Sequence, residues 1–133
     1  MKKEEMKVLN LIIKQKYFDA ILQGRKVQEF REIRPTTVKK YVQIDDEGYE
    51  VEDELGNSIP IEYDAIRFFV GYNKDRDSAL VEVTSAYTEV FVDENDQPIT
   101  YEYQGKTWWA EQVVYNLGKI LETDVHPKSR VKN

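Results

Sequence analysis

The stretch that decides the fold is residues 12–34, IIKQKYFDAILQGRKVQEFREIR. Apolar side chains recur in it at positions i, i+1, i+4 and i+5, the spacing of one helix face, and they are Tyr17, Phe18, Ile21 and Leu22. Gly24 follows at the position where a helix commonly ends on a residue with positive φ. The pattern predicts the end of a strand, a helix over residues 15–23 with Tyr17 in the core, and a second strand over residues 27–33.

Ionisable side chains gather from this glycine onward, where Gly24, Lys26, Glu29 and Arg31 spell G-x-K-x-x-E-x-R. Because successive side chains of a strand point to opposite faces, Glu29 and Arg31 would share a face, with Lys26 at the strand mouth. One interpretation is a surface ion-pair cluster that contributes about 0–1 kcal/mol per exposed pair. The other is a polar pocket in which Arg31 recognises phosphate or carboxylate and Glu29 accepts a proton or a base-edge N–H. A desolvated Lys26 would serve there as a base or nucleophile.

Composition excludes several classes of site. The chain has no cysteine and a single histidine, His126, which excludes disulfides, thiolate metal ligands, a Ser-His-Asp triad and a multi-histidine zinc site. We therefore expect neither a metal nor a cofactor. A chain of 133 residues is expected to form one domain, and no apolar run approaches the roughly 18 residues of a membrane span. The expectation is a cytoplasmic protein without a membrane partner.

Charge is distributed unevenly along the sequence, although the net charge is −6. Residues 1–40 carry eleven Lys or Arg against five Asp or Glu, whereas residues 41–133 carry eight against twenty. A basic first third is typical of a face that meets phosphate or nucleic acid. The alternative is a solvated chain whose charges mix in three dimensions, and the sequence leaves both open.

The remainder of the chain reads as strands joined by turns, over residues 7–13, 65–72, 79–92 and 99–103, with short strands and tight turns over residues 38–64. Nine acidic residues lie between positions 45 and 64 without the spacing of a calcium loop, so a solvated hairpin is expected there. Residues 106–122 fit both a helix and a strand. We predict a strand over residues 112–122, after a turn or short helix at Trp108 and Trp109, and a loosely ordered tail from about residue 123.

The run K-Y-F-D-A-I-L-Q-G-R-K-V-Q-E-F-R, with the strand before it, resembles the start of an ASCH domain of the PUA-like superfamily. The hallmark of that family is a short helix ending in G-x-K-x-x-E-x-R. The segments A-L-V-E-V-T-S-A-Y and L-G-K-I-L-E are similar to its later strands. The resemblance implies an α+β, mainly β fold, which is a PUA-like pseudo-barrel of mixed strands with short helices packed at its ends, formed by residues 1–133 as a single domain.

The resemblance also implies a class of ligand. Family members are generally proposed to bind RNA or nucleotides, and some small relatives are amidohydrolases that release the acyl group of N4-acetylcytidine with a Lys, a Thr and a Glu. Lys26 matches the lysine of that set, Glu29 stands where the threonine is expected, and Glu111 is a candidate for the third member.

Three hypotheses about function follow. The first is an RNA- or nucleotide-binding module in which Lys26 and Arg31 meet phosphate or a base edge and Glu29 reads an exocyclic amine. Trp108 or Trp109, unless buried in the core, would stack on the base. The second is a small metal-free amidohydrolase that acts on an acylated nucleoside, with Lys26 and Glu29 as its catalytic residues. The third is a protein-interaction module that has no small-molecule site and uses the acidic hairpins.

Overall fold

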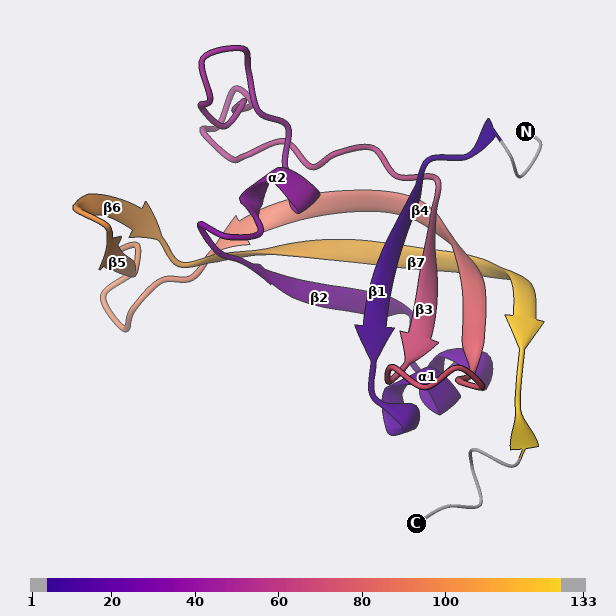
Figure 1. Ribbon diagram of the computed structural model, residues 1–133. Coiled ribbons are helices and arrows are strands. Elements are labelled where there is room, and N and C mark those ends of the chain that lie inside the picture. The colour runs from indigo at the N-terminus through magenta and orange to yellow at the C-terminus, as the bar shows by residue number, and fades with distance from the viewer. Residues whose placement is uncertain (1–4, 128–133) are drawn as a thin grey trace. The chain divides into compact units, whose positions relative to one another are not determined.

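The computed structural model describes residues 5–127, which form a mainly β structure with two short helices (Figure 1). The helices are α1 (Gln15–Leu22) and α2 (Val38–Tyr41). The strands are β1 (Val8–Ile13), β2 (Gln28–Ile33), β3 (Ala65–Val70), β4 (Ser78–Val90), β5 (Thr100–Tyr103), β6 (Lys106–Trp109) and β7 (Glu111–Asp124). The predicted strand–helix–strand order at the N-terminus is confirmed, as is a strand rather than a helix over residues 112–122.

The main sheet is mixed and has the strand order β1-β3-β4-β7-β2. β1 and β3 are parallel, with Val8 opposite Ala65, whereas β3 and β4 are antiparallel. Both β1 and β3 are rich in buried aliphatic and aromatic side chains, as expected of strands covered on their faces, and the largest of these are Leu9, Leu11, Ile66 and Phe68. The mainly β class and the mixed sheet are therefore as the sequence predicted.

Two local predictions were wrong. Trp108 and Trp109 lie in strand β6 rather than in a turn or helix, because the preceding residues Gln104 and Gly105 both have positive φ, 49° and 77°. Two such residues form the tight turn whose twist suits a hairpin, and β5 and β6 accordingly pair antiparallel with Tyr103 opposite Lys106. The short helix α2 was also not anticipated, since four residues are too few to display a helical period.

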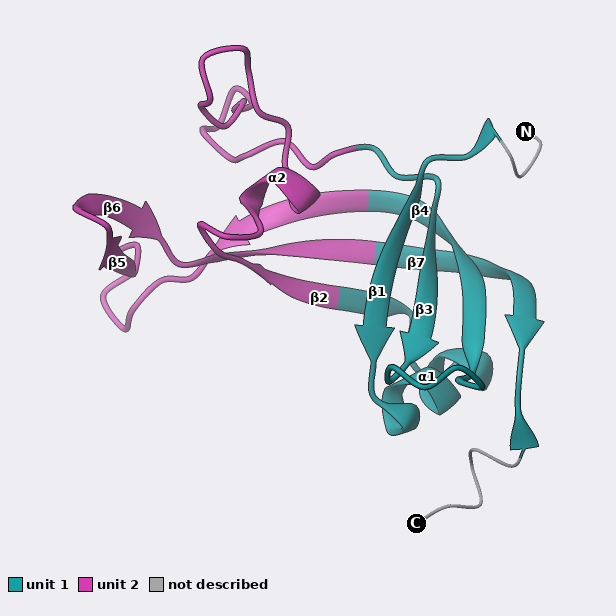
Figure 2. Cartoon of the chain, viewed as in Figure 1, with its two compact units in different colours: residues 1–29, 62–85, 116–133 teal, residues 30–61, 86–115 magenta. Residues whose placement is uncertain are grey.

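The chain forms two compact units (Figure 2). Unit 1 comprises residues 1–29, 62–85 and 116–133, and unit 2 comprises residues 30–61 and 86–115. Strands β2, β4 and β7 contribute residues to both units. Each unit has its own set of buried side chains, which include Phe18, Phe68 and Val81 in unit 1 and Val42 and Val113 in unit 2.

Unit 2 repeats one kind of turn three times. The Oδ1 atoms of Asp45, Asp53 and Asp93 each accept hydrogen bonds from the backbone N–H groups two and four residues later, at 2.8–3.0 Å. The residue three positions after each aspartate has a positive φ: Gly48, Gly56 and Asp96. Aspartate favours such turns because its side chain satisfies backbone donors. Three of the fourteen acidic residues of unit 2 therefore stabilise turns.

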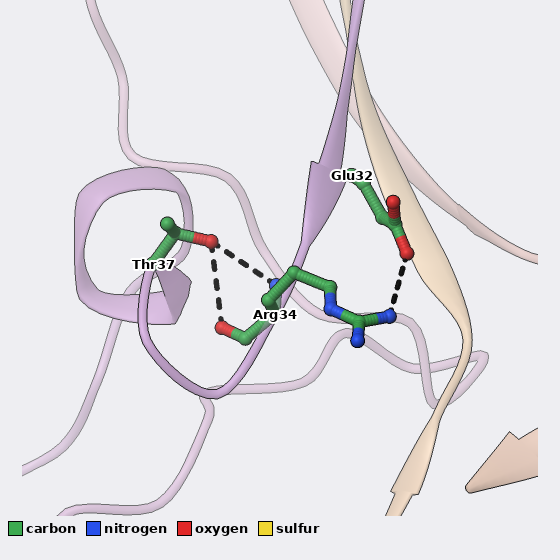
Figure 3. Close-up of polar contacts among 3 residues, drawn as sticks. All are labelled: Glu32, Arg34 and Thr37. Atoms are coloured by element: carbon green, nitrogen blue, oxygen red, sulfur yellow. Dashed lines mark hydrogen bonds and ion pairs between the residues drawn. The ribbon is translucent and has the colours of Figure 1, made fainter.

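The proline turn after β2 is closed by polar contacts around Arg34 (Figure 3). The backbone N–H of Arg34 donates to Thr37 Oγ1 at 3.1 Å, and the Arg34 guanidinium lies 2.7 Å from Glu32 Oε1. The central carbon of the Arg34 guanidinium, Cζ, lies 4.8 Å from the centroid of the Tyr101 ring. Burial raises the pKa of Tyr101, and the positive charge of Arg34 acts in the opposite direction. These contacts join the start of unit 2 to strand β5.

The C-terminal end of the described chain remains hydrogen-bonded past the end of the predicted strand. β7 includes Thr123 and Asp124, and the backbone N–H of His126 donates to Asp77 Oδ1 at 2.7 Å. The rest of the expected loosely ordered tail, residues 128–133, lies outside the described residues.

Candidate functional site

The glycine stop after α1 sets the position of Lys26. Gly24 has φ of 74°, its N–H donates to Ile21 O at 3.1 Å, and the N–H of Arg25 donates to Ala20 O at 2.9 Å. This pair of bonds is the Schellman arrangement that satisfies the last carbonyl groups of a helix. The N–H of Lys26 also donates to Ala20 O, at 3.1 Å. The backbone before β2 is therefore fixed by the helix end, as the position of the glycine predicted.

Lys26 and Glu29 form an ion pair within unit 1. Lys26 Nζ lies 3.1 Å from Glu29 Oε1, and the two side chains are 19% and 6% exposed. A buried charge must be paired, because removing it from water costs several kcal/mol. The structure therefore brings together two of the residues that the sequence singled out. It also shows that they are more than a loose surface pair.

An aromatic ring that the sequence analysis assigned to the core lies beside this pair. Lys26 Nζ is 5.6 Å from the centroid of the Tyr17 ring, a distance at which a cation is attracted to an aromatic face. Tyr17 is 44% exposed, so the prediction that it is a core residue was wrong. It belongs to the apolar helix stripe by spacing, but it lies at the solvent edge of that stripe. The spacing alone carried no signal of its contact with Lys26.

Strand β2 is held in place beside β7 by amide contacts within unit 1. The N–H of Leu117 donates to Val27 O at 2.9 Å, and Gln28 Nε2 donates to Asn116 Oδ1 at 2.8 Å. Asn116 Nδ2 in turn donates to Ser85 Oγ, also at 2.8 Å. These bonds fix the register of the segment that carries Glu29, so the position of its carboxylate does not depend on the ion pair alone.

Three further predicted site residues belong to unit 2. Arg31 is half-buried and follows Glu29 by two positions on β2, which agrees with the face predicted for both. Trp108 and Trp109 lie on β6, where Trp109 is exposed and Trp108 is half-buried. Within unit 1 the ring beside Lys26 is that of Tyr17. The predicted stacking of a tryptophan at the G-x-K-x-x-E-x-R motif stays a prediction.

Unit 2 contains a cavity that the sequence did not predict. It has a volume of about 170 Å³, and its walls come from the acidic hairpins, β6 and the start of β7: Glu50, Glu52, Ser58, Lys106, Thr107, Trp108, Trp109 and Glu111. A second cavity of about 340 Å³ shares four of these residues, Glu50, Glu52, Lys106 and Trp108. We call the first the β6 cavity. Sequence patterns singled out three of its residues, Trp108, Trp109 and Glu111, but not their grouping with Glu50 and Glu52, because the walls are far apart along the chain.

Glu111 is the most unusual ionisable group of the β6 cavity. The residue is 5% exposed, and burial raises the pKa of its carboxyl to about 8, with the charge and hydrogen bond of Glu50 acting in the same direction. Glu50 also accepts a hydrogen bond from Ser58 Oγ at 2.7 Å, and Ser58 O accepts one from Thr88 Oγ1 at 2.6 Å. Glu111 therefore keeps its proton to a higher pH than an ordinary carboxyl does, beside the carboxyl group of Glu50.

Glu111 and Lys26 belong to different units, so the third member of a hydrolase set stays unassigned. Among the described residues no group of three or more histidine, cysteine or acidic side chains is arranged to hold a metal ion. Neither α1 nor α2, the helices of residues 5–127, has the length and apolar character needed to cross a bilayer.

Comparison with known proteins gives no assignment for this arrangement. No family model matches the sequence. No curated protein and no solved structure matches it either.

Proposed function

We propose that this chain is an ASCH-type domain, a PUA-like pseudo-barrel, and that unit 1 binds a nucleotide or RNA at the Lys26–Glu29 pair. The observation that carries the proposal is the ion pair itself: an ammonium and a carboxylate 3.1 Å apart, largely withdrawn from water, at the end of the G-x-K motif. Such a pair presents one hydrogen-bond donor group and one acceptor side by side. The edge of a nucleobase presents an acceptor that can face the ammonium group and an N–H donor that can face the carboxylate.

Each side chain has a distinct role in this proposal. Glu29 accepts a hydrogen bond from an exocyclic amine, and Lys26 donates to a base-edge acceptor or to phosphate. Tyr17, with its ring exposed beside Lys26, supplies a face on which a base stacks. Arg31, Trp108 and Trp109 belong to unit 2, and this proposal for unit 1 does not depend on them.

The distribution of charge between the units supports unit 1 as the phosphate-binding unit. By sequence, unit 1 carries fourteen Lys or Arg against eleven Asp or Glu, a balance of +3, and its described residues carry nine against ten. Unit 2 carries five against fourteen, a balance of −9. Because phosphate binding is driven by neutralisation of its charge, the acidic unit is the less favourable partner.

The ion pair favours binding over amide hydrolysis. A lysine that acts as base or nucleophile must lose its charge first, and the neighbouring carboxylate of Glu29 stabilises that charge. Hydrolysis of an acylated nucleoside would require the pair to separate when substrate binds. Product analysis of any ligand that binds distinguishes the two activities.

A thermal-shift screen of the intact chain against nucleosides, nucleotides and short RNAs tests the proposal. A ligand at 100 times its Kd adds about 2.7 kcal/mol of apparent stability, which is ample for detection. We expect the shift to disappear in Lys26→Ala and Glu29→Gln. It should persist in Lys119→Ala, which removes the same charge from an exposed position of unit 1. A shift that survives both site variants, or no shift with any of these ligands, would contradict the proposal.

A further inference from the structure

The wall of the β6 cavity includes an alkylammonium group of the chain itself, that of Lys106. Lys106 Nζ lies 4.9 Å from the centroid of the Trp108 ring and 5.9 Å from that of Tyr49. A cation within about 6 Å of an aromatic face is attracted by the ring quadrupole, most strongly by tryptophan. Lys106 thus shows which chemistry the cavity wall accepts.

The remaining lining explains why a cation suits this place. Glu50 and Glu52 contribute carboxylates to the wall, and Glu111 contributes a third carboxyl. Lys106 is the one Lys or Arg among the described residues that line the two cavities. Because the raised pKa of Glu111 favours its neutral form, the wall sets the two carboxylates of Glu50 and Glu52 against the one ammonium group of Lys106. In a unit with a net charge of −9, this wall attracts a second positive group and repels an anion.

The site also has room for a ligand. A single water needs only about 15 Å³ of such space, whereas the β6 cavity measures about 170 Å³. Lys106 is an exposed residue at the start of β6, next to the tight turn of the hairpin. Its flexible four-carbon stem allows the ammonium group to leave the ring of Trp108 without a change in the backbone.

We propose that the β6 cavity is a binding site for an organic cation, an alkylammonium or guanidinium group on a short apolar chain, which replaces the Lys106 ammonium group over Trp108. The charged head lies between the indole face and the carboxylates of Glu50 and Glu52, while the apolar chain follows Trp109. A lysine or arginine side chain of a protein segment and a free amine both present this chemistry. This site is independent of the proposed function of unit 1.

Tryptophan fluorescence reports directly on this site, because the two tryptophans of the chain, Trp108 and Trp109, both line the β6 cavity. The intact protein is titrated with n-butylammonium chloride, and n-pentanol serves as a neutral probe of similar size. The capped peptide Ac-Gly-Lys-Gly-NH2 and its norleucine counterpart test a peptide-borne ammonium in the same way. We expect saturable changes in emission with the two cations and none with the two neutral probes. Equal responses to charged and neutral probes would overturn the proposal.

The decisive variant is Lys106→Ala, because it removes the competing internal cation. We expect it to lower the Kd for n-butylammonium about two- to fivefold, which is the range set by a surface cation–π contact. The matched control Lys39→Ala removes the same charge from an exposed position of α2 and should leave the Kd unchanged. A weaker or unchanged affinity in Lys106→Ala would overturn the proposal.

Two further variants separate this site from unit 1. Glu52→Gln removes a charge from the wall and should raise the Kd severalfold. Lys26→Ala, which disrupts the proposed nucleotide site, should leave the fluorescence response intact. A saturable response to nucleosides, with none to ammonium compounds, would also overturn the cation site.

Discussion

The two units contain carboxyl groups that are equally buried but have opposite partners. Glu29 in unit 1 and Glu111 in unit 2 are each 5% exposed. Glu29 lies 3.1 Å from the ammonium group of Lys26, whereas Glu111 shares a hydrogen bond with another carboxyl, that of Glu50. One partner stabilises the negative charge, and the other makes it unfavourable. The comparison shows that the same side chain, at the same burial, serves as an acceptor in one unit and holds a proton in the other.

The largest expected effect concerns pH and Glu111. The pKa of its carboxyl rises from an ordinary value of 4.5 to about 8 in the folded chain. Between about pH 4.5 and pH 8, the folded state therefore holds a proton on Glu111 that the unfolded state releases. The contribution of Glu111 to stability is then fully present below the unfolded pKa and is lost as pH rises through the folded pKa, at about 1.4 kcal/mol per pH unit.

Urea unfolding at a series of pH values measures this contribution. The variant Glu111→Gln cannot titrate, so the difference in unfolding free energy between wild type and variant should fall with rising pH. It should level off above about pH 8. A difference that stays constant from pH 5 to pH 8 would show that the folded state does not hold the extra proton on Glu111.

The second prediction removes the partner that distinguishes Glu29. Lys26→Met removes the ammonium group 3.1 Å from the buried Glu29 carboxylate. We expect a loss of about 3 kcal/mol in the unfolding free energy, the lower end of the range for a broken buried pair, because a fifth of the Lys26 side chain reaches solvent. The double variant Lys26→Met, Glu29→Leu should recover most of this loss. If the single variant cost less than 1 kcal/mol, the pair would be no different from a surface pair.

A smaller effect is expected at the aspartate turns of unit 2. Asp53→Ala removes an acceptor of two backbone N–H groups, at 2.9 and 3.0 Å, and should lower the unfolding free energy by about 1–2 kcal/mol. Asp53→Asn retains the acceptor oxygen and should cost little. Equal losses in both variants would mean that the charge, rather than the hydrogen bonds, stabilises the turn.

The smallest effect is expected at Gly118, in the part of β7 that belongs to unit 1. A Cβ at this position would collide with the Glu82 carboxylate and the Thr84 methyl group of β4. Gly118→Ala should therefore cost about 1 kcal/mol, since the Glu82 side chain can move aside in part. Thermal unfolding measures this loss, and the double variant Gly118→Ala, Glu82→Ala should relieve part of it. A Gly118→Ala variant as stable as wild type would exclude the close approach.

Local signals in the sequence were sufficient for the first part of the fold. The helix period and the glycine at position 24 predicted α1 and β2. A Schellman helix end depends only on residues close together in the sequence, so a local pattern is enough to identify it. Lys26 and Glu29 were singled out for the same reason, as they are three positions apart at the start of one strand. The sequence did not show how far solvent reaches Tyr17, which depends on what surrounds the helix.

Long-range pairing accounts for what the sequence did not predict. The β6 cavity brings Glu50 and Glu111, sixty-one positions apart, into one wall, and no local pattern carries that information. The tight turn before β6 uses Gln104 in place of the Asn or Asp that usually marks such turns, so the strand that carries the tryptophans was overlooked. The expected pseudo-barrel, likewise, depends on closure between distant strands and stays a prediction.

The sharing of β2, β4 and β7 between the two units has a consequence for genetic dissection. Unit 2 is interrupted by residues 62–85, so no single cut in the gene separates it from unit 1. A deletion of residues 86–115 also removes the last five residues of β4 and the first five of β7, and it leaves both strands truncated. The two proposed activities can therefore be lost one at a time by point substitution, but a single crossover cannot exchange one unit without the other.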